Sequence, residues 1–334
     1  MHQFLFDYGL FLAKTVTWVA ALLAVGLGIL ILARAARQQG GPRLEVKNLN
    51  RRLRELAELL NHEMLGADQL KQEHKRLKAE DKARAKALKH TLNGGGADRQ
   101  RLFVLDFHGD LEASRVAALR EEISALLQVA RPQDEVLLRL ESAGGVVHGY
   151  GLAASQLRRI RERGLRLTVA VDKVAASGGY LMACVADRVM AAPFAIVGSI
   201  GVVAQLPNFN RLLREKHIDF ELHTAGEYKR TLTLFGENTE AGRAKFREEL
   251  EHTFGLFKDF VAANRPSLKL DQVATGEHWY GTQALELGLV DAIRTSDDYL
   301  LERVADADVF ELRFRLRRNL LQQLLGGLAR AAGL

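Results

Sequence analysis

The pattern of apolar and polar positions divides the chain into three regions, of which the first is almost entirely apolar. From Thr15 to Ala33 every residue except two threonines and two glycines is apolar, and none is charged. About 19 helical residues at ~1.5 Å each span ~28 Å, close to the ~30 Å hydrocarbon core of a bilayer. A cleaved signal peptide is the alternative, but it needs a basic start and a shorter apolar run. Because the chain begins Met1-His2-Gln3-Phe4, without Lys or Arg, we favour an uncleaved membrane anchor over residues 1–33.

The second region, residues 34–97, is polar and has helical periodicity. Residues 44–90 are rich in Ala, Leu, Lys, Arg and Glu and contain no proline, and Leu49, Leu53, Leu56 and Leu60 recur at helical spacing. This pattern predicts a solvated helical stalk or a short coiled coil, with attraction to anionic lipid headgroups as the functional alternative. Gly94-Gly95-Gly96 breaks the helix and predicts a linker at its end.

In the third region short apolar runs alternate with helical periodicity. The predicted strands are 102–107, 136–140 and 167–171, and the predicted helices are 114–129, 150–163 and 179–186. Strands that alternate with helices indicate an α/β fold with parallel strands and right-handed crossover helices. We therefore predict one α/β domain over residues 98–300. The last part, 301–334, is predicted to be an amphipathic extension, because leucines and arginines interleave from Leu312 to Leu334 in a pattern that fits an interface or a lipid surface.

Charge is unevenly distributed along the 334 residues. Residues 34–92 hold 15 of the 47 Lys and Arg residues but only 8 of the 41 Asp and Glu residues, so the net charge of +6 belongs to the stalk. The nearly neutral globular region argues against a nucleic-acid partner. The one cysteine, Cys184, excludes an intramolecular disulfide and lies in an apolar run, where a free thiol usually packs as a small hydrophobe.

Three glycine-containing turns follow predicted strands, where parallel sheets place their binding sites. They are the segments 141–145, 175–179 and 197–201. Within the second, Ser177 is flanked by Ala176 and Gly178, which leave its hydroxyl accessible for nucleophilic attack. A helix N-cap serine is the structural alternative, and from this motif alone the two interpretations are about equally supported.

Four segments taken together resemble the signal peptide peptidase A family, serine peptidase family S49, and most closely its SohB branch. They are Val171-Asp-Lys-Val-Ala-Ala-Ser177-Gly-Gly-Tyr180, Gly198-Ser199-Ile-Gly-Val202, Gly226-Glu-Tyr-Lys229-Arg and Trp279-Tyr-Gly-Thr-Gln-Ala-Leu-Glu-Leu-Gly-Leu-Val-Asp291. The resemblance covers essentially the whole chain. It differs at Ala143, where the family usually has proline.

The resemblance implies a ClpP/crotonase-like fold and a serine-type endopeptidase with a Ser–Lys dyad, without a cofactor or metal. The family's nucleophile falls on Ser177, its general base on Lys229 and the hydroxyl that orients the lysine on Ser199. The oxyanion-hole amides fall on the Gly144-Gly145 turn and on Gly178. A lysine is a base only when neutral, and burial favours the neutral form. The histidines His108, His148, His223 and His278 leave a Ser–His pair open by counting alone.

The resemblance also implies a place and partners for the protein. It implies a single-pass protein of the inner (plasma) membrane, peptide substrates such as signal-peptide remnants, contact with membrane lipid, and a closed homo-oligomeric ring. The seven Lys and Arg residues from Arg34 to Arg54 favour the cytoplasmic face for the domain, whereas related anchored peptidases are often assigned to the outer face. An acyl-CoA enzyme of the same fold and an inactive membrane scaffold are the rival functions.

Overall fold

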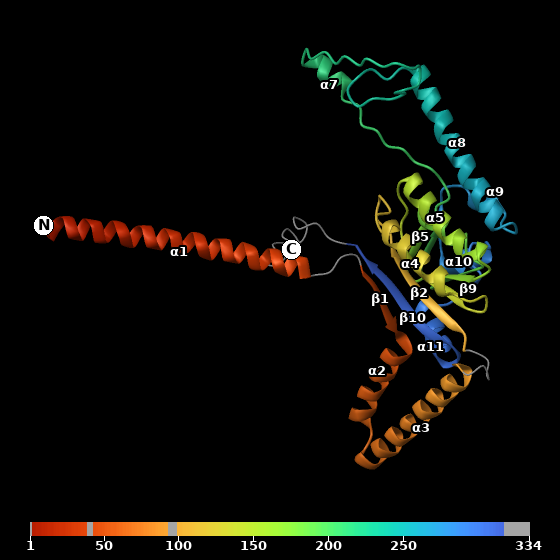
Figure 1. Cartoon of the computed structure of the whole chain (residues 1–334). Helices are drawn as coiled ribbons and strands as arrows, with labels where there is room; N and C mark the ends of the chain where they lie inside the picture. Colours follow the sequence, from red (N-terminus) through yellow and green to blue (C-terminus); the bar gives the residue numbers. More distant parts are fainter. Residues whose placement is uncertain (1, 39–42, 93–98, 317–334) are drawn as a thin grey trace. The chain divides into compact units, whose positions relative to one another are not determined.

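The computed structural model describes residues 2–38, 43–92 and 99–316 (Figure 1). Residues 46–313 form one compact unit, and the described residues outside that range, which include the first helix, belong to a second unit. The Gly94–Gly96 linker lies outside the described residues, as does most of the predicted C-terminal helix.

The predicted anchor forms a single helix, α1 (His2–Gln38). Its segment Gly9–Gly28 has a mean hydropathy of 1.9 and is long and apolar enough to cross a membrane. Large apolar side chains such as Phe11, Trp18 and Leu23 are two-thirds or more exposed on this helix. An exposed apolar surface of this extent is unfavourable in water, which fits a helix that is covered by something other than its own chain.

The predicted stalk is helical over most of its length but differs from the prediction in two places. Residues Arg43–Asn48 form strand β1 rather than helix, and the helical part is broken at Leu65 and Gly66 into α2 (Leu49–Met64) and α3 (Ala67–Leu92). The first two residues of α2, Leu49 and Asn50, are also buried rather than solvated. The Asn50 amide donates to the carbonyls of Val304 and Ala307, and its oxygen accepts from the Val309 amide at 2.7 Å. The leucine spacing alone does not show that hydrogen bonds hold the start of α2 to residues 304–309.

Within the described residues, seven strands form the main sheet in the order β1-β10-β2-β3-β4-β6-β9. Each neighbouring pair of strands is parallel from β10 through β2, β3, β4 and β6 to β9. The new strands are β2 (Arg101–His108), β3 (Glu135–Glu141), β4 (Arg166–Val171), β6 (Arg188–Ala191), β9 (Ala292–Ile293) and β10 (Asp308–Arg315). The predicted α/β fold with parallel strands and crossover helices is therefore confirmed.

Helices cover both faces of this sheet. The crossover helices α4 (Val116–Val129) and α5 (Val147–Glu162) lie on one face, where Tyr150 of α5 meets Phe107 of β2 edge to face. On the other face α11 (Ser296–Asp306) places Tyr299 and Leu300 in a buried cluster with Leu102, Val104 and Leu137. Burying both faces explains why these strands are continuous apolar runs.

A second, smaller sheet was not predicted from the sequence. Its strands are β5 (Val174–Ala176), β7 (Ile196–Gly198) and β8 (His278–Tyr280), of which β5 and β7 are parallel and β7 and β8 antiparallel. Helix α6 (Gly178–Ala183) follows β5 directly. Because β5 and β7 are parallel and in register, the residues that follow them, Ser177 and Ser199, emerge side by side.

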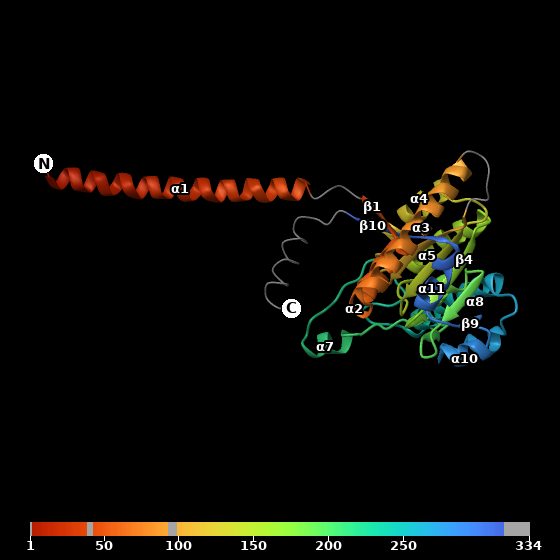
Figure 2. The same ribbon diagram turned by 90° about the horizontal axis from the view of Figure 1, so that it is seen from below.

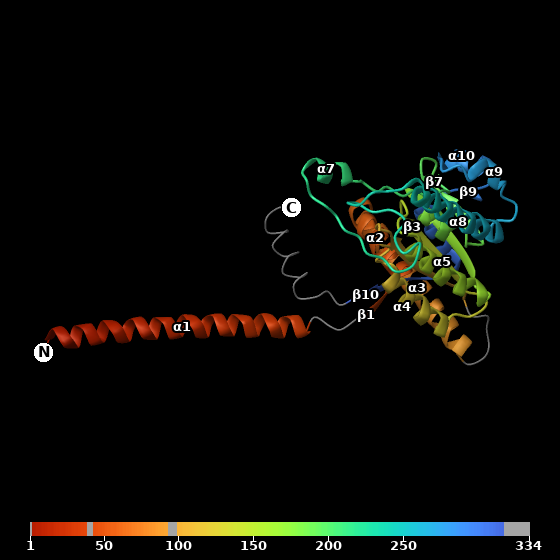
Figure 3. The same ribbon diagram turned by 90° about the horizontal axis from the view of Figure 1, so that it is seen from above.

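The remaining helices are α7 (Asn210–Glu215), α8 (Glu240–Asn264), α9 (Leu270–Val273) and α10 (Gly281–Glu286). Figures 1, 2 and 3 agree in placing α10 beside β9, at the edge of the main sheet beyond β6. The long connection from β7 to α8, which carries α7, extends away from the sheet in Figures 1 and 3. We call residues 202–239 of this connection the arm.

The C-terminal part departs from the predicted extension at 301–334. Residues up to Asp306 complete α11, and residues 308–315 form β10, which pairs with β2 in the register Asp308–Arg101 to Glu311–Val104. The main sheet therefore continues past residue 300, and a helix cannot start at Leu312. The physical reason is that Glu311 and Arg313, which look like surface residues in the sequence, form ion pairs over the sheet.

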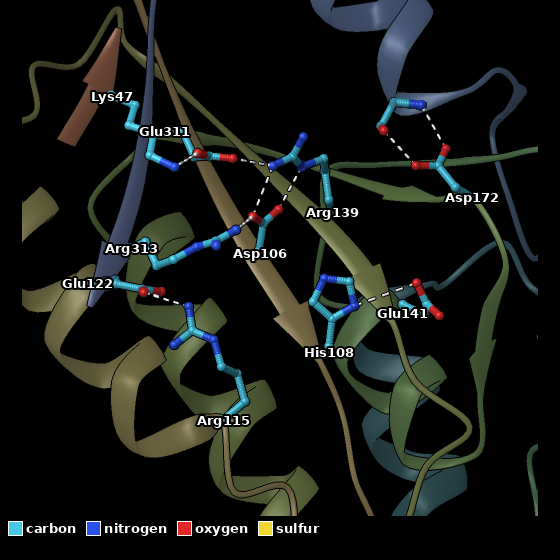
Figure 4. Close-up of polar contacts among 11 residues, drawn as sticks. Lys47, Asp106, His108, Arg115, Glu122, Arg139, Glu141, Asp172, Glu311 and Arg313 are labelled. Carbon is cyan, nitrogen blue, oxygen red and sulfur yellow. Dashed lines mark hydrogen bonds and ion pairs between the residues drawn. The ribbon is translucent and has the colours of Figure 1, made fainter. Parts of the chain in front are cut away.

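These ion pairs form a charged network on the α11 face (Figure 4). Arg139 of β3 donates to both oxygens of Asp106 at 2.6 and 2.9 Å and to Glu311 at 2.5 Å, and Arg313 donates to Asp106 at 3.0 Å. Burial alone would raise the pKa of the Asp106 carboxyl, but hydrogen bonds and charge from Arg139 and Arg313 hold this pKa below its ordinary value. The network ties together β2, β3 and β10 near the ends of β2 and β3, from which two site-forming loops emerge.

Candidate active site

Ser177 lies at a sharp turn between β5 and α6. Its backbone has φ 52° and ψ −118°, a strained combination for a residue other than glycine. Its amide donates to the Gly198 carbonyl at 2.8 Å, and its carbonyl accepts from the Leu181 amide at 3.0 Å. Strain of this kind persists only where the surrounding structure fixes it, and a strained strand-to-helix turn is also how other hydrolases expose a nucleophilic serine.

Ser199 occupies the matching turn after β7. It also has a positive φ, 52°, and its amide donates to the Glu277 carbonyl at 2.6 Å. The register pairs Ala176 with Gly198, which places Ser177 and Ser199 at adjacent turns at the end of the small sheet. The structure thus brings together two of the hydroxyl-bearing residues singled out in the sequence.

The Gly144-Gly145 turn, which follows β3, packs directly against the Ser177 turn. A Cβ added at Gly144, where φ is +90°, would lie 2.7 Å from the Gly178 nitrogen and 2.8 Å from Ser177 Cβ. A Cβ added at Gly145 would lie 2.1 Å from the Leu111 carbonyl oxygen. Glycine at both positions is therefore a steric requirement of this close approach.

The amides of this turn differ in their partners. The Gly144 amide donates to Ser142 Oγ at 3.1 Å. The amides of Gly145 and Gly178 have no hydrogen-bond acceptor among the residues that the structure describes. Two such donors beside a serine hydroxyl can stabilise a developing oxyanion.

Ser177, Ser199 and the three glycines line one cavity of about 900 Å³. Its other walls are mainly apolar and include Val147 and Tyr150 of α5, Leu181 of α6, and Leu256, Phe257 and Phe260 of α8. None of the described residues that line the cavity is charged, and none is a histidine.

Lys229 is separate from this cavity. It lies in the arm, in an exposed turn where its amide donates to the Gly226 carbonyl at 3.2 Å, and it is not among the residues that line the cavity. Its neighbour Tyr228 is also exposed, at 55%. The structure therefore brings together five of the six candidate residues and leaves Lys229 apart.

Comparison with known proteins identifies the family. A sequence model described as "Peptidase family S49" matches residues 159–309, and one described as "Peptidase family S49 N-terminal" matches residues 3–157. The chain belongs to peptidase family S49. The match over residues 159–309 contains Ser177, Ser199 and Lys229, and the match over residues 3–157 contains the Gly144-Gly145 turn, so proteolysis is the activity supported by the family.

Curated relatives of this S49 peptidase carry the name "Probable protease SohB". The protein from Haemophilus influenzae is 50% identical over 327 residues, covering 97% of this chain and 92% of the relative. The protein from Buchnera aphidicola subsp. Schlechtendalia chinensis is 49% identical, covering 90% of this chain and all of the relative. A solved structure of a mutant 1510-N membrane-bound stomatin-specific protease covers 64% of this chain and 98% of its own, at 11% identity and a TM-score of 0.43.

The histidines named in the sequence analysis lie outside the cavity of this peptidase. His108 lies 3.5 Å from Glu141 on the α11 face of the sheet, His223 lies 3.3 Å from Glu221 in the arm, and His148 and His278 are exposed. Cys184 is buried, and burial raises the pKa of its thiol to about 12, which agrees with a small core residue rather than a reactive thiol.

Two polar residues behind the Gly144-Gly145 turn were missed by sequence reasoning. Ser142 and Tyr150 are both fully buried and hydrogen-bonded to each other at 2.6 Å, behind the Gly144-Gly145 turn. The available signal was weak, because a tyrosine on the apolar face of an amphipathic helix usually indicates core packing. The apolar residues of α8 that line the cavity, such as Phe257 and Phe260, were missed because the connection between β7 and α8 is long.

Proposed function

We propose that this S49 peptidase is a serine endopeptidase in which Ser177 is the nucleophile and Lys229 the general base. The observation that carries the proposal is the strained Ser177 turn, placed in an apolar cavity beside two unoccupied amide donors. A serine that only caps a helix would not require the backbone strain. The Ser177 side chain also makes no capping hydrogen bond to α6.

In the proposed reaction, neutral Lys229 accepts the Ser177 proton as Oγ attacks the carbonyl carbon of the peptide. The amides of Gly145 and Gly178 stabilise the oxyanion, while Gly144 allows the two turns to approach each other. The lysine then returns its proton to the leaving amine, and water hydrolyses the acyl-enzyme. Ser199 has the role of orienting the lysine, since its turn lies beside that of Ser177.

The separation of Lys229 from the cavity leads us to propose that assembly completes the site. The described residues that line the cavity include no carboxylate, lysine or histidine that could accept the proton, so the base must arrive on another segment. The arm that carries Lys229 exposes large apolar side chains, among them Val203, Leu212, Ile218 and Tyr228. Covering these side chains in a homo-oligomer would remove Lys229 from water, which favours its neutral form.

The substrate class follows from the cavity and from α1. Apolar walls such as Leu181 and Phe257 suit a peptide with apolar side chains, such as a remnant of a signal peptide. The Gly9–Gly28 segment would anchor the enzyme in the inner membrane and in contact with its lipids, near such substrates. The basic residues that follow the apolar segment, from Arg34 to Arg54, favour a cytoplasmic domain. Digestion of the domain by protease added to intact spheroplasts would contradict that orientation.

The dyad is tested by hydrolysis of a fluorogenic apolar peptide by the full chain in detergent. Wild type should cleave the peptide, and Ser177→Ala and Lys229→Ala should each be reduced to ~10³-fold or more below it. Mixing the two variants tests the assembly, because recovered activity shows that a neighbouring chain supplies the base, and no recovery within a confirmed oligomer shows that it comes from the same chain. Retention of cleavage by Lys229→Ala, or a monomer with full activity, would contradict the proposal.

A further inference from the structure

Tyr150 lies at the centre of the site, although the other buried residues of its helix, α5, pack in the hydrophobic core. It belongs to the first turn of α5 and is fully buried, with its ring against Phe107. Its hydroxyl lies 2.6 Å from Ser142 Oγ and donates to the Asp110 carbonyl at 2.8 Å. Burial raises the pKa of this phenol, so the hydroxyl keeps its proton and is not a candidate base.

The hydrogen-bond directions in this group follow from counting protons. A tyrosine hydroxyl has one proton, and Tyr150 gives it to the Asp110 carbonyl. In the contact with Ser142, the serine hydroxyl must therefore be the donor. Ser142 Oγ in turn accepts from the Gly144 amide at 3.1 Å. The result is a directed chain from the Gly144 amide through Ser142 and Tyr150 to the Asp110 carbonyl, in which each bond strengthens the next.

This chain holds one half of the proposed oxyanion site. The orientation of the Gly144 peptide fixes the position of the next amide, that of Gly145. The backbone of Ser142 is fixed as well, since its amide donates to the Val174 carbonyl at 2.8 Å and its carbonyl accepts from the Ala176 amide at 3.0 Å. Ser142 therefore connects the glycine turn to the strand that leads into Ser177.

The ring of Tyr150 supports the other half of the oxyanion site. A Cβ added at Gly178 would lie 2.4 Å from Tyr150 Cγ, so the ring lies directly behind the Gly178 backbone. On the other side, a Cβ added at Gly109 would lie 2.3 Å from the Tyr150 hydroxyl. One side chain thus touches the Gly178 backbone directly and reaches the Gly144-Gly145 turn through Ser142.

We propose that Tyr150 is a positioning residue, which holds the amides of Gly145 and Gly178 at the mutual orientation that an oxyanion requires. The inference rests on the proposed function of Ser177. It assigns separate tasks to the hydroxyl, which acts through Ser142 on the glycine turn, and to the ring, which supports Gly178.

The hydroxyl is tested by Tyr150→Phe, which keeps the ring, and by Ser142→Ala, which breaks the same chain one bond earlier. Tyr180→Phe is the matched control, because Tyr180 is equally buried and its hydroxyl donates to the Leu289 carbonyl at 3.0 Å, outside the chain. The full-length protein in detergent is treated with a fluorophosphonate probe, whose reaction with Ser177 needs the oxyanion donors but not the peptide-binding walls. Melting temperature and peptide kcat and KM are measured in parallel.

Tyr150→Phe and Ser142→Ala should each slow labelling of Ser177 and lower kcat by ~10- to 100-fold with little change in KM, since a small misplacement at a reacting centre costs rates of this order. The double variant should be no slower than the slower single variant, because both substitutions break one chain. Tyr180→Phe should label at close to the wild-type rate, with a melting temperature similar to that of Tyr150→Phe.

Labelling of Tyr150→Phe or Ser142→Ala at the rate of Tyr180→Phe, multiplied losses in the double variant, or a loss confined to KM would overturn the positioning role. If Tyr150→Phe fails to fold, Ser142→Ala decides the matter alone. A wild-type protein that is never labelled at Ser177 would overturn the proposed function, and this inference with it. Failure of the positioning role alone would leave wild-type labelling intact.

Discussion

Substitution of Gly144 by alanine tests the geometry of the site most sharply, because the structure predicts two separable costs. Gly144 has φ +90°, where an L-residue is strained by about 1–2 kcal/mol. The added Cβ would also lie 2.7 Å from the Gly178 nitrogen and 2.8 Å from both the Ala176 oxygen and Ser177 Cβ. All these neighbours are backbone or nucleophile, so relief of the clash must displace the reacting groups by roughly half an ångström. Displacements of this size cost ~10- to 100-fold in rate.

Gly164→Ala is the control for the strain alone. Gly164 follows α5 with φ +74°, and a Cβ there would meet nothing within 4 Å. Gly164→Ala should lose about 1–2 kcal/mol of unfolding free energy, a fall of a few degrees in melting temperature, and Gly144→Ala should lose at least as much, because it adds the clash to the strain. Only Gly144→Ala should also lose ~10- to 100-fold in kcat for a fluorogenic peptide. Equal activity of the two variants would refute the close approach of the glycine turn to Ser177.

Other predictions concern the base and the charged network. Lys229→Ala should abolish peptide hydrolysis while leaving the melting temperature within about 1 °C of wild type, because the side chain is exposed; a large loss of stability would contradict its surface position. Arg139→Met should lower the unfolding free energy by about 3 kcal/mol in chemical denaturation, since Asp106 and Glu311 lose their shared partner; an unchanged midpoint would contradict this. The pKa of Asp106 is lower in the folded chain than in the unfolded one, so its contribution to stability is complete above about pH 5, begins to fall near the ordinary aspartate pKa of ~4 and is lost as the pH drops through the lower pKa of the folded chain. Melting temperatures between about pH 3 and 6 should show a smaller acid-induced decrease in Arg139→Met than in wild type, and identical pH profiles would count against the network.

The sequence was sufficient to locate the main elements of the fold because both faces of the sheet are buried. Continuous apolar runs mark β2, β3 and β4, and helical periodicity marks α4 and α5. The three-residue strands β5, β7 and β8 are too short to show a periodicity, so the small sheet that aligns Ser177 with Ser199 was not predicted. The last part of β10, from Leu312, was interpreted as the start of a helix, because the ion pairs of the buried Glu311 and the half-buried Arg313 are not visible in a hydropathy pattern.

The candidate site was predictable to the extent that its chemistry depends on local motifs. The glycine turns and Ser177 stand out in the sequence because small residues must occupy a close backbone approach. Tyr150 does not, since its role depends on which backbone segments the fold brings to its hydroxyl and ring. The position of Lys229 outside the cavity was equally hidden, because the arm residues around it are exposed and form no helix or strand whose periodicity a sequence could show.

Site mapping of a fluorophosphonate adduct tests most directly whether Ser177 is the nucleophile of this S49 peptidase. The full-length protein in detergent is labelled, digested and analysed by mass spectrometry, with Ser177→Ala and Ser199→Ala treated in parallel. We expect one adduct, on Ser177. It should be absent from Ser177→Ala, and in Ser199→Ala it should still form on Ser177, at a lower rate. An adduct on Ser199 or another residue, or labelling that survives in Ser177→Ala, would contradict this role of Ser177.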